Sequence, residues 1–442
     1  MDNLTTLEPL NSAKGGIKSM IMVVSQHVFV DGEPKEEFAN FLDLFRENCS
    51  DINFLFVIPN DVDIPEGFLA SNSKLIDFRL EEHTNEKGVL SRDSLLYVDL
   101  DFKKIRNQMQ TSGGNCASSE TTTVEDFWTP TDWIQDQFFV LNDSEGSPVL
   151  IDPYYIWVNM NFLFSQESKD RAFAEIVNSF LPSIISSNSG ILLRANRFFF
   201  QGGDVIGGEK MVFVGQEIVK RNLDYYFPNV LQNGENWRKD FDEFWNQLKK
   251  SFHADYLICP GLSVAENGVS FLKLPTGLQH LDQFFVYAET DIENEAGRKV
   301  LVGEMYEWKD EMWVKKAERR STRQYFLNQI ADWLKNQVVH GFEYPFQFNV
   351  ERIPICEVND YTRMYSPNCH LHTENEETIA FVGKFASSWN ARNQKYKAAD
   401  QLVKAAFEKT GIRVVPVSGG ILSGSTTQNS GLHCLTKVLM RE

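Results

Sequence analysis

Residues 237–260 have the sequence WRKDFDEFWNQLKKSFHADYLICP. The first part has an apolar residue at every third or fourth position, as on one face of an α-helix: Trp237, Phe241, Phe244, Trp245 and Leu248. The run DYLICP that follows has the short apolar pattern of a buried strand. The stretch therefore predicts a helix followed directly by a strand.

The same order of patterns, a helix and then a β-rich run, occurs five times along the chain. The other helices are predicted at about 35–48, about 166–181, 326–334 and 396–406, with Gly411 as the stop of the last one. The strand-like runs that follow them are INFLFVI, GILLRA, FQFNVERI and IRVVPV. A polar segment and a second short strand complete each unit: QFFVLN, MVFVG, QFFVYA, TIAFVG and CLTKVL.

Five units of mixed α/β character predict a closed ring of small sheets, a five-bladed α/β propeller in a single domain. A doubly wound parallel sheet is the competing fold, but it would need a Gly-rich turn directly after the first strand, which the sequence lacks. We expect residues 1–20 to be an N-terminal extension and residues 21–442 to form the propeller. Residues of about 80–130, which contain TSGGNCASSETTT, are expected to be a surface insertion.

The composition excludes several classes of protein. The 442 residues include 43 Lys and Arg against 61 Asp and Glu, so the net charge is −18, which opposes nucleic-acid binding and favours cationic partners. We find neither a run of about 18 apolar residues nor a signal-peptide pattern, and we expect a cytoplasmic protein without membrane association. The six cysteines form no CxxC pair, which argues against a disulfide framework and a zinc site.

Polar segments occupy equivalent places in the five units: WIQD (133–136), QGGD (201–204), HLD (280–282), SPNC (366–369) and HC (433–434). In a closed ring, equivalent ends of the units meet on the axis. We therefore expect Asp136, His280, Asp282 and Cys434 to surround one pocket.

Each of these residues also has a simpler interpretation. Asp136 lies in an apolar stretch, where a carboxylate needs a cationic partner, and Trp133 beside it suits either the core or a bound cation. His280 and Asp282 lie two apart on a predicted strand, and they would form either an acid-base pair or a surface pair. Cys434 is either an inert small hydrophobe or a nucleophile with a lowered pKa.

The paired glycines Gly202 and Gly203, with Gln201 before them, indicate either a turn or a close approach of the backbone to a ligand. His370 and His372 could be a pair of metal ligands, but no third ligand lies at a suitable spacing. We therefore expect neither a metal nor another cofactor.

Together, the WIQD run, the later Gly-Gly-Asp, the His-x-Asp before aromatic residues and the Cys near the C-terminus resemble the guanidine-modifying, or pentein, superfamily. WIQD and the HC pair are most similar to the catalytic domain of protein-arginine deiminases. The segments QGGDVIGGEKMVFVG and QHLDQFF are similar to parts of arginine deiminase. The resemblance covers roughly residues 20–442 and implies a five-bladed α/β propeller.

The resemblance also implies a site. Cys434 would attack the central guanidinium carbon, while Asp136 and Asp282 would hold the guanidinium nitrogens. His280 would act as general acid and base, and Arg197 would bind the backbone of a peptide substrate. The implied reaction hydrolyses a guanidine through a covalent thiouronium and releases ammonia.

Four positions depart from the known patterns. The calcium-activated enzymes have acids shortly after the first motif, whereas this chain has Gln137 and Phe139, which argues against calcium activation. Gln201 replaces the Glu of small-guanidine deiminases, and Gln428 replaces an arginine of the peptide enzymes. We expect a deiminase of arginine in peptides or proteins. The alternatives are a deiminase of agmatine or free arginine and, from another class, a propeller that only binds a partner.

Overall fold

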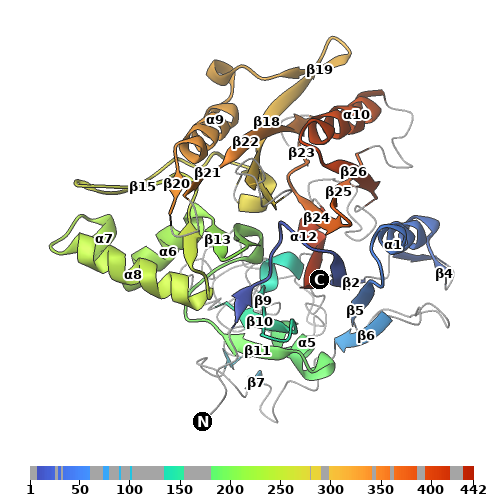
Figure 1. Cartoon of the computed structure of the whole chain (residues 1–442), viewed down its shortest axis with the longest axis horizontal. Helices are drawn as coiled ribbons and strands as arrows, with labels where there is room; N and C mark the ends of the chain where they lie inside the picture. The colour runs from blue at the N-terminus through green and yellow to red at the C-terminus, as the bar shows by residue number, and fades with distance from the viewer. Residues whose placement is uncertain are drawn as a thin grey trace, which may run out of the picture.

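The structure is a computed structural model of the chain (Figure 1). It describes residues 7–24, 28–30, 33–59, 73–78, 89–90, 100–101, 134–153, 181–278, 280–289, 298–340, 345–358, 363–385, 394–418 and 432–442. In Figure 1 the sheets surround the middle of the molecule, and the long helices lie on its outside.

Five sheets share one topology, in which a central strand pairs antiparallel with one neighbour and parallel with the other. The three strands of each sheet, with the central strand second, are β9(Phe139–Asn142), β10(Pro148–Asp152) and β11(Leu192–Ala195); β12(Val205–Gly208), β13(Met211–Val214) and β14(Tyr256–Ile258); β17(Phe285–Glu289), β18(Arg298–Lys309) and β22(Asn349–Glu357); β24(Cys369–Glu374), β25(Glu377–Gly383) and β26(Arg413–Val417); β27(Thr436–Arg441), β2(Ile17–Val23) and β5(Asn53–Pro59).

Helices connect the two parallel strands of each sheet, because parallel neighbours cannot be joined by a tight hairpin. These helices are α5(Leu181–Ser189), the series α6(Gln216–Tyr226), α7(Pro228–Leu231) and α8(Trp237–Ser251), then α9(Thr322–Lys335), α10(Gln394–Lys409) and α1(Glu36–Asn48). The helices predicted at 35–48, 237–248, 326–334 and 396–406 are thus confirmed. Gly411 has φ +81°, which fits its predicted role as the stop of α10. The helix predicted at 166–181 lies outside the described residues except for Leu181, where α5 begins.

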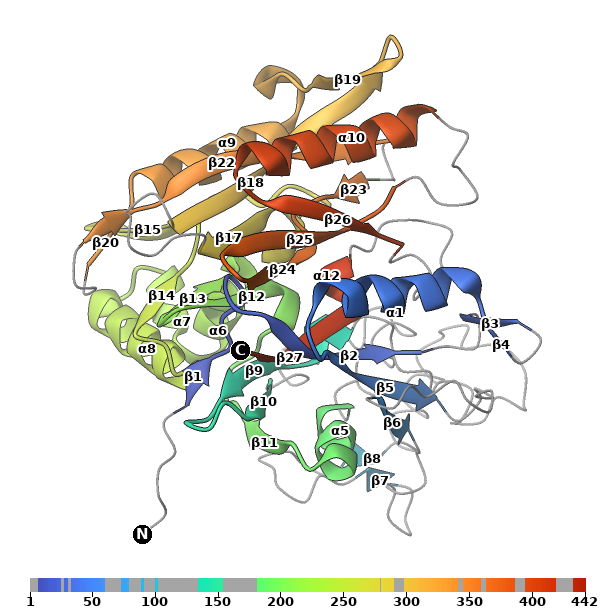
Figure 2. The same cartoon turned by 45° about the vertical axis from the view of Figure 1, so that its right-hand side comes forward.

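The first and last parts of the chain share a sheet, since β2 pairs with both β27 and β5. The strand β1(Glu8–Pro9) pairs with β9. Regular structure therefore begins before the boundary that we placed at residue 20, and part of the expected N-terminal extension belongs to two of the sheets. Figure 2 shows β1 and β2 within the body of the molecule.

The remaining strands extend these sheets or form short pairs. β6(Ser73–Phe78) extends the sheet of β5, while β19(Met312–Lys315) and β23(Arg363–Tyr365) extend that of β18 and β22. The pairs are β3(Phe29–Val30) with β4(Glu33–Pro34), β7(Val89–Leu90) with β8(Leu100–Asp101), β15(Leu262–Ala265) with β16(Gly268–Phe271), and β20(Val338–Val339) with β21(Phe346–Gln347). Apart from β7 and β8, the expected insertion at about 80–130 lies outside the described residues.

Four turns of 3-10 helix complete the described secondary structure: η4(Ile134–Gln137), η6(Gly202–Asp204), η7(Leu281–Gln283) and η9(Glu318–Arg320). The short helix α12(Leu432–Leu435) precedes β27. Within the described ranges, no helix has the length and hydrophobicity that crossing a lipid bilayer requires.

Aromatic side chains join neighbouring units. Phe45 of α1 is fully buried and stacks on Phe381 of β25, with ring centroids 4.1 Å apart. Helix α1 connects β2 and β5, whereas β25 belongs to another sheet, and both residues are part of one apolar cluster. Packing of this kind fixes one unit against the next.

We predict that Phe45→Ala destabilises the protein by about 3–5 kcal/mol, because it leaves a cavity between two units. Urea unfolding of the variant and the wild type measures the difference. Tyr325→Ala, at a residue that is 51% exposed on α9, is the control and should change stability by less than about 0.5 kcal/mol. A Phe45→Ala protein as stable as the Tyr325→Ala control would contradict this packing.

Candidate active site

The five polar segments of the sequence meet in the structure. α12, which contains the HC pair, contacts η4 of the WIQD segment and β24, which starts at the end of SPNC. η4 contacts η6 of the QGGD segment, and η6 contacts η7 of the HLD segment. Segments from distant parts of the chain thus form one cluster of contacts.

Gly202 lets two of these turns pack in direct contact. A Cβ on Gly202 would lie 1.8 Å from the carbonyl oxygen of Gln135 and 2.8 Å from that of Phe138. The Gln135 amide also donates Nε2–H to the Gly202 carbonyl oxygen at 3.2 Å. The backbone that approaches Gly202 closely is therefore that of η4. The packing of these two turns requires a glycine at this position, whether or not a ligand binds.

Asp204 ties η6 to the next turn. Its buried carboxylate accepts the backbone N–H of Leu281 at 2.8 Å, and Leu281 lies between His280 and Asp282. Gly215 makes room for this carboxylate, because a Cβ there would lie 2.2 Å from Asp204 Oδ1.

Asp282 is 2% exposed and forms a hydrogen bond across the cluster. His433 of α12 donates Nδ1–H to Asp282 Oδ2 at 3.0 Å, since an ionised carboxylate can only accept. The His433 side chain is 12% exposed. A buried carboxylate is costly without such a donor, so His433 contributes to the stability of Asp282 in its charged form.

His370 of β24 packs against His433, with ring centroids 4.8 Å apart. Thr436 donates its hydroxyl to the Leu432 carbonyl oxygen, so this hydroxyl accepts Nε2–H of His370 at 2.7 Å. Burial lowers the pKa of His370 well below its usual value, and the nearby charges of His433, Arg441 and Lys437 lower it further. His370 is therefore a neutral imidazole at physiological pH.

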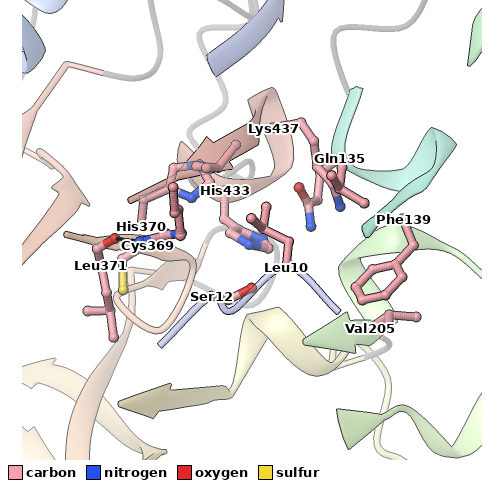
Figure 3. Close-up of a pocket in the computed structure, with 13 residues that line it drawn as sticks. Leu10, Ser12, Gln135, Phe139, Val205, Cys369, His370, Leu371, His433 and Lys437 are labelled. Carbon is pink, nitrogen blue, oxygen red and sulfur yellow. Dashed lines mark hydrogen bonds between the residues drawn. The ribbon is translucent and has the colours of Figure 1, made fainter. Parts of the chain in front are cut away.

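A pocket opens beside these histidines (Figure 3). It encloses about 410 Å³ of empty space, part of it open to solvent, and is lined by Leu10, Ser12, Gln135, Phe139, Val140, Val205, Cys369, His370, Leu371, His433, Lys437, Val438 and Arg441. In Figure 3, His433 lies between His370 and Cys369 on one side and Gln135 and Lys437 on the other. The pocket thus adjoins the residue that holds Asp282.

The cysteines whose side chains the structure describes are poor nucleophiles. Cys259, Cys356 and Cys369 are buried, and burial raises the pKa of each thiol far above its usual value. Burial also raises the pKa of Cys49 to about 12. All four are uncharged thiols at neutral pH, whereas nucleophilic attack needs the thiolate. Cys116 lies outside the described residues.

The structure describes some of the other predicted site residues in full, some in part and one not at all. Trp133 lies outside the described residues. Asp136 and Cys434 belong to η4 and α12, but the positions of their side chains are outside what the structure describes, and their roles stay predictions. Gln201 is partly exposed at the start of η6, and Gly203 is buried within it.

Arg197 is exposed on the outer surface. It donates to Gln247 Oε1 of α8 at 2.7 Å, and its guanidinium lies 4.9 Å from the ring centroid of Phe198 and 5.3 Å from that of Tyr226. None of these three partners lines the pocket.

Two local predictions need correction. His280 and Asp282 do not lie on a strand, because Asp282 is part of η7 and strand β17 begins only at Phe285. The Asp204 carboxylate holds the Leu281 N–H, and Gln283 Oε1 accepts the N–H of His280 at 3.3 Å, so these amides bind side chains instead of a neighbouring strand. Cys434 lies in α12, one turn of helix before β27, and does not start that strand.

Sequence reasoning missed His433, Asp204 and Thr436 as parts of the cluster. His433 and Asp204 lie within the HC and QGGD motifs, so membership of these motifs was the sequence signal that could have identified them. Their partners lie 151 and 77 residues away, and only the folded chain shows those contacts. The pair that we considered as metal ligands has structural contacts: His370 binds Thr436, and His372 accepts the Ile17 N–H at 2.9 Å.

Solved structures of the same fold span the chain from end to end. A proposed peptidyl-arginine deiminase aligns over 99% of this chain and 100% of its own, with 12% identity and a TM-score of 0.53. Agmatine deiminase of Enterococcus faecalis aligns over 100% and 99%, with 9% identity and a TM-score of 0.52. A proposed arginine deiminase from Porphyromonas gingivalis aligns over 98% and 97%, with 12% identity and a TM-score of 0.51.

These structures are members of the guanidine-modifying, or pentein, superfamily, so the chain has the pentein fold that its motifs predicted, a mixed α/β architecture. No protein-family model matches the sequence, and neither does any curated protein.

We predict that His370→Gln makes the protein less sensitive to acid. His370 has a lower pKa in the folded than in the unfolded chain, so the unfolded chain binds more protons and stability falls as the pH drops below about 6.5. Between pH 7.5 and pH 5.5 the wild type should lose on the order of 1 kcal/mol more than the variant, measured by urea unfolding. Equal losses would mean that His370 takes up a proton freely in the folded protein.

Proposed function

We propose that this protein is a cysteine-dependent hydrolase that deiminates arginine in peptides or proteins to citrulline and releases ammonia. The observation that carries the proposal is that η4 contacts α12 and η6, that η6 contacts η7, and that the buried Asp282 carboxylate of η7 binds His433 of α12. These turns contain the four motifs that resemble the guanidine-modifying enzymes. The pentein fold shared with solved deiminases supports the same chemistry.

In this proposal the two acids bind the substrate cation. Asp282 and Asp136 accept the guanidinium N–H groups, and a planar cation between two carboxylates is fixed in orientation by paired charge-assisted hydrogen bonds. The cation in turn offsets the cost of burying two negative charges. His433 of α12 binds Oδ2 of Asp282 at 3.0 Å, which adds a hydrogen bond to this carboxylate beside the proposed guanidinium contacts.

Cys434 supplies the nucleophile. Its thiolate attacks the central guanidinium carbon, and the C–N bond to the departing nitrogen breaks as His280 protonates the leaving ammonia. The product of this half is a covalent thiouronium on the Cys434 sulfur. His280 then takes a proton from water, the resulting hydroxide attacks the same carbon, and the thiolate leaves to give the ureido group of citrulline.

The substrate is proposed to be protein-bound or peptide-bound arginine. The net charge of −18 attracts cationic partners. Gln201 stands where small-guanidine deiminases have Glu, and this difference disfavours the recognition of free arginine. Trp133, Gln201, Gly202, Gly203 and Arg197 are the proposed substrate-binding residues, and for Arg197 this requires the peptide to extend over the surface near α8.

At the level of the whole chain, we propose that the five sheets are the blades of one closed α/β propeller, with the pocket on its axis. The shared pairing pattern and the joining of the first and last units by β2 and β27 support this arrangement. A cytoplasmic location, and the absence of nucleic-acid and membrane partners, remain part of the proposal from the composition.

We predict that the wild type converts an arginine-containing peptide to the citrulline product faster than it converts agmatine or free arginine. Mass spectrometry of the three reaction mixtures detects the ureido products. Faster turnover of agmatine or arginine would favour the small-guanidine alternative. If none of the three is turned over, the hydrolase proposal is wrong, and a propeller that only binds a partner becomes the better account.

We predict that Cys434→Ala and Asp136→Asn each lower turnover at least about 100-fold while the urea unfolding curve keeps its shape, because one loses the nucleophile and the other a charge that holds the cation. Cys49→Ala, at a buried cysteine on no motif of the proposed site, is the control and should keep wild-type kcat. Wild-type turnover of either site variant would refute the role assigned to that residue.

A further inference from the structure

The turn η6, residues 202–204, lies between the two turns that contain the proposed guanidinium-binding acids. On one side it contacts η4, which contains Asp136. On the other side it contacts η7, which contains Asp282 and follows His280. The position of η6 therefore influences the separation of the two acids.

The contact with η4 has no space for adjustment. Gly202 is buried, and even a methyl group there would overlap the Gln135 carbonyl oxygen, which immediately precedes Asp136 in the chain. The Gln135 side chain, 2% exposed, crosses the same contact with its hydrogen bond to the Gly202 carbonyl oxygen. The backbone of η6 and the backbone of η4 are thus held at one distance.

The contact with η7 includes a hydrogen bond to a buried carboxylate. Asp204 is 3% exposed, and its Oδ1 accepts the N–H of Leu281, which is 1% exposed. The Asp204 backbone is fixed in turn, because its N–H donates to the Gln201 carbonyl oxygen at 2.9 Å and its own carbonyl oxygen accepts the Gly215 N–H at 2.8 Å. Leu281 is the residue between His280 and Asp282, so this hydrogen bond acts directly on the backbone that presents both side chains.

We propose that Asp204 is a positioning residue of the reaction: it fixes the His280–Asp282 turn at the distance from η4 at which one guanidinium can contact both acids and the general acid and base. This inference rests on the proposed function and adds a role for the Gly-Gly-Asp motif within it. By this account Gly202 and Asp204 act together as a spacer between the two acids. A misplacement of about 1 Å at a catalytic group can cost about 100-fold in rate.

The test compares three variants with a matched control. Asp204→Ala removes the acceptor. Gly215→Ala keeps the carboxylate but pushes it away, and φ at Gly215 is −68°, which alanine adopts without strain. Asp204→Asn keeps an oxygen that can accept the Leu281 N–H. The control is Gln324→Ala, because Gln324 is 1% exposed and accepts the Met305 N–H at 2.7 Å away from the cluster.

We expect kcat of Asp204→Ala and Gly215→Ala, per folded molecule, to fall about 100-fold, and Asp204→Asn to recover about tenfold of that loss. Gln324→Ala should lower stability similarly but keep wild-type kcat. Hydrogen exchange measured by mass spectrometry should show faster exchange of the peptide that contains Leu281 in the first two variants alone.

The outcomes separate the two proposals. Wild-type kcat in Asp204→Ala and Gly215→Ala, or an unchanged exchange rate at Leu281, would overturn the positioning role even if the protein is a deiminase. A wild type without turnover would overturn the proposed function, whereas the exchange measurement would still show whether Asp204 holds the turn.

Discussion

The Asp282 carboxylate is almost completely buried at the point where segments from the whole length of the chain meet. A charge in such a place is stable only with donors close by, and one donor that the structure places on it is Nδ1 of His433, 151 residues away. The ring packing of His433 on His370 and the hydrogen bond from His370 to Thr436 extend this interaction into β24 and β27. The contacts that form the candidate site are therefore also the contacts that join distant units of the chain.

The fold makes this junction possible by repeating one connection. In each of the five sheets a helix joins the two parallel strands, and the helices lie on the outside of the molecule (Figure 1). The turns that precede the first strand of each sheet therefore lie toward the middle. η4, η6 and η7 precede β9, β12 and β17, and α12 precedes β27. Turns of this kind have free backbone amides that bind side chains, as Leu281 does with Asp204. The geometry of the candidate site comes from these turns.

Much of this arrangement follows from sequence patterns, and some of it does not. The helices with a continuous apolar stripe, such as Phe241, Phe244 and Leu248 of α8, are predictable because the stripe must be buried against a sheet. The segments around His280 and Cys434 are short and have no periodic pattern of apolar residues. Their local structure is therefore set by partners far along the chain. Asp204 and His433 illustrate this limit: their residue types are compatible with many roles, and the contact that decides between them exists only after folding.

A crystal structure of the protein with a bound arginine-containing peptide, in a variant that lacks the Cys434 sulfur or in an unreacted complex, tests the central claim most directly. Our account predicts a guanidinium between the carboxylates of Asp136 and Asp282, with His280 beside a terminal nitrogen and residue 434 facing the central carbon. A guanidinium bound away from these groups, or a Cys434 side chain directed away from both acids, would contradict it.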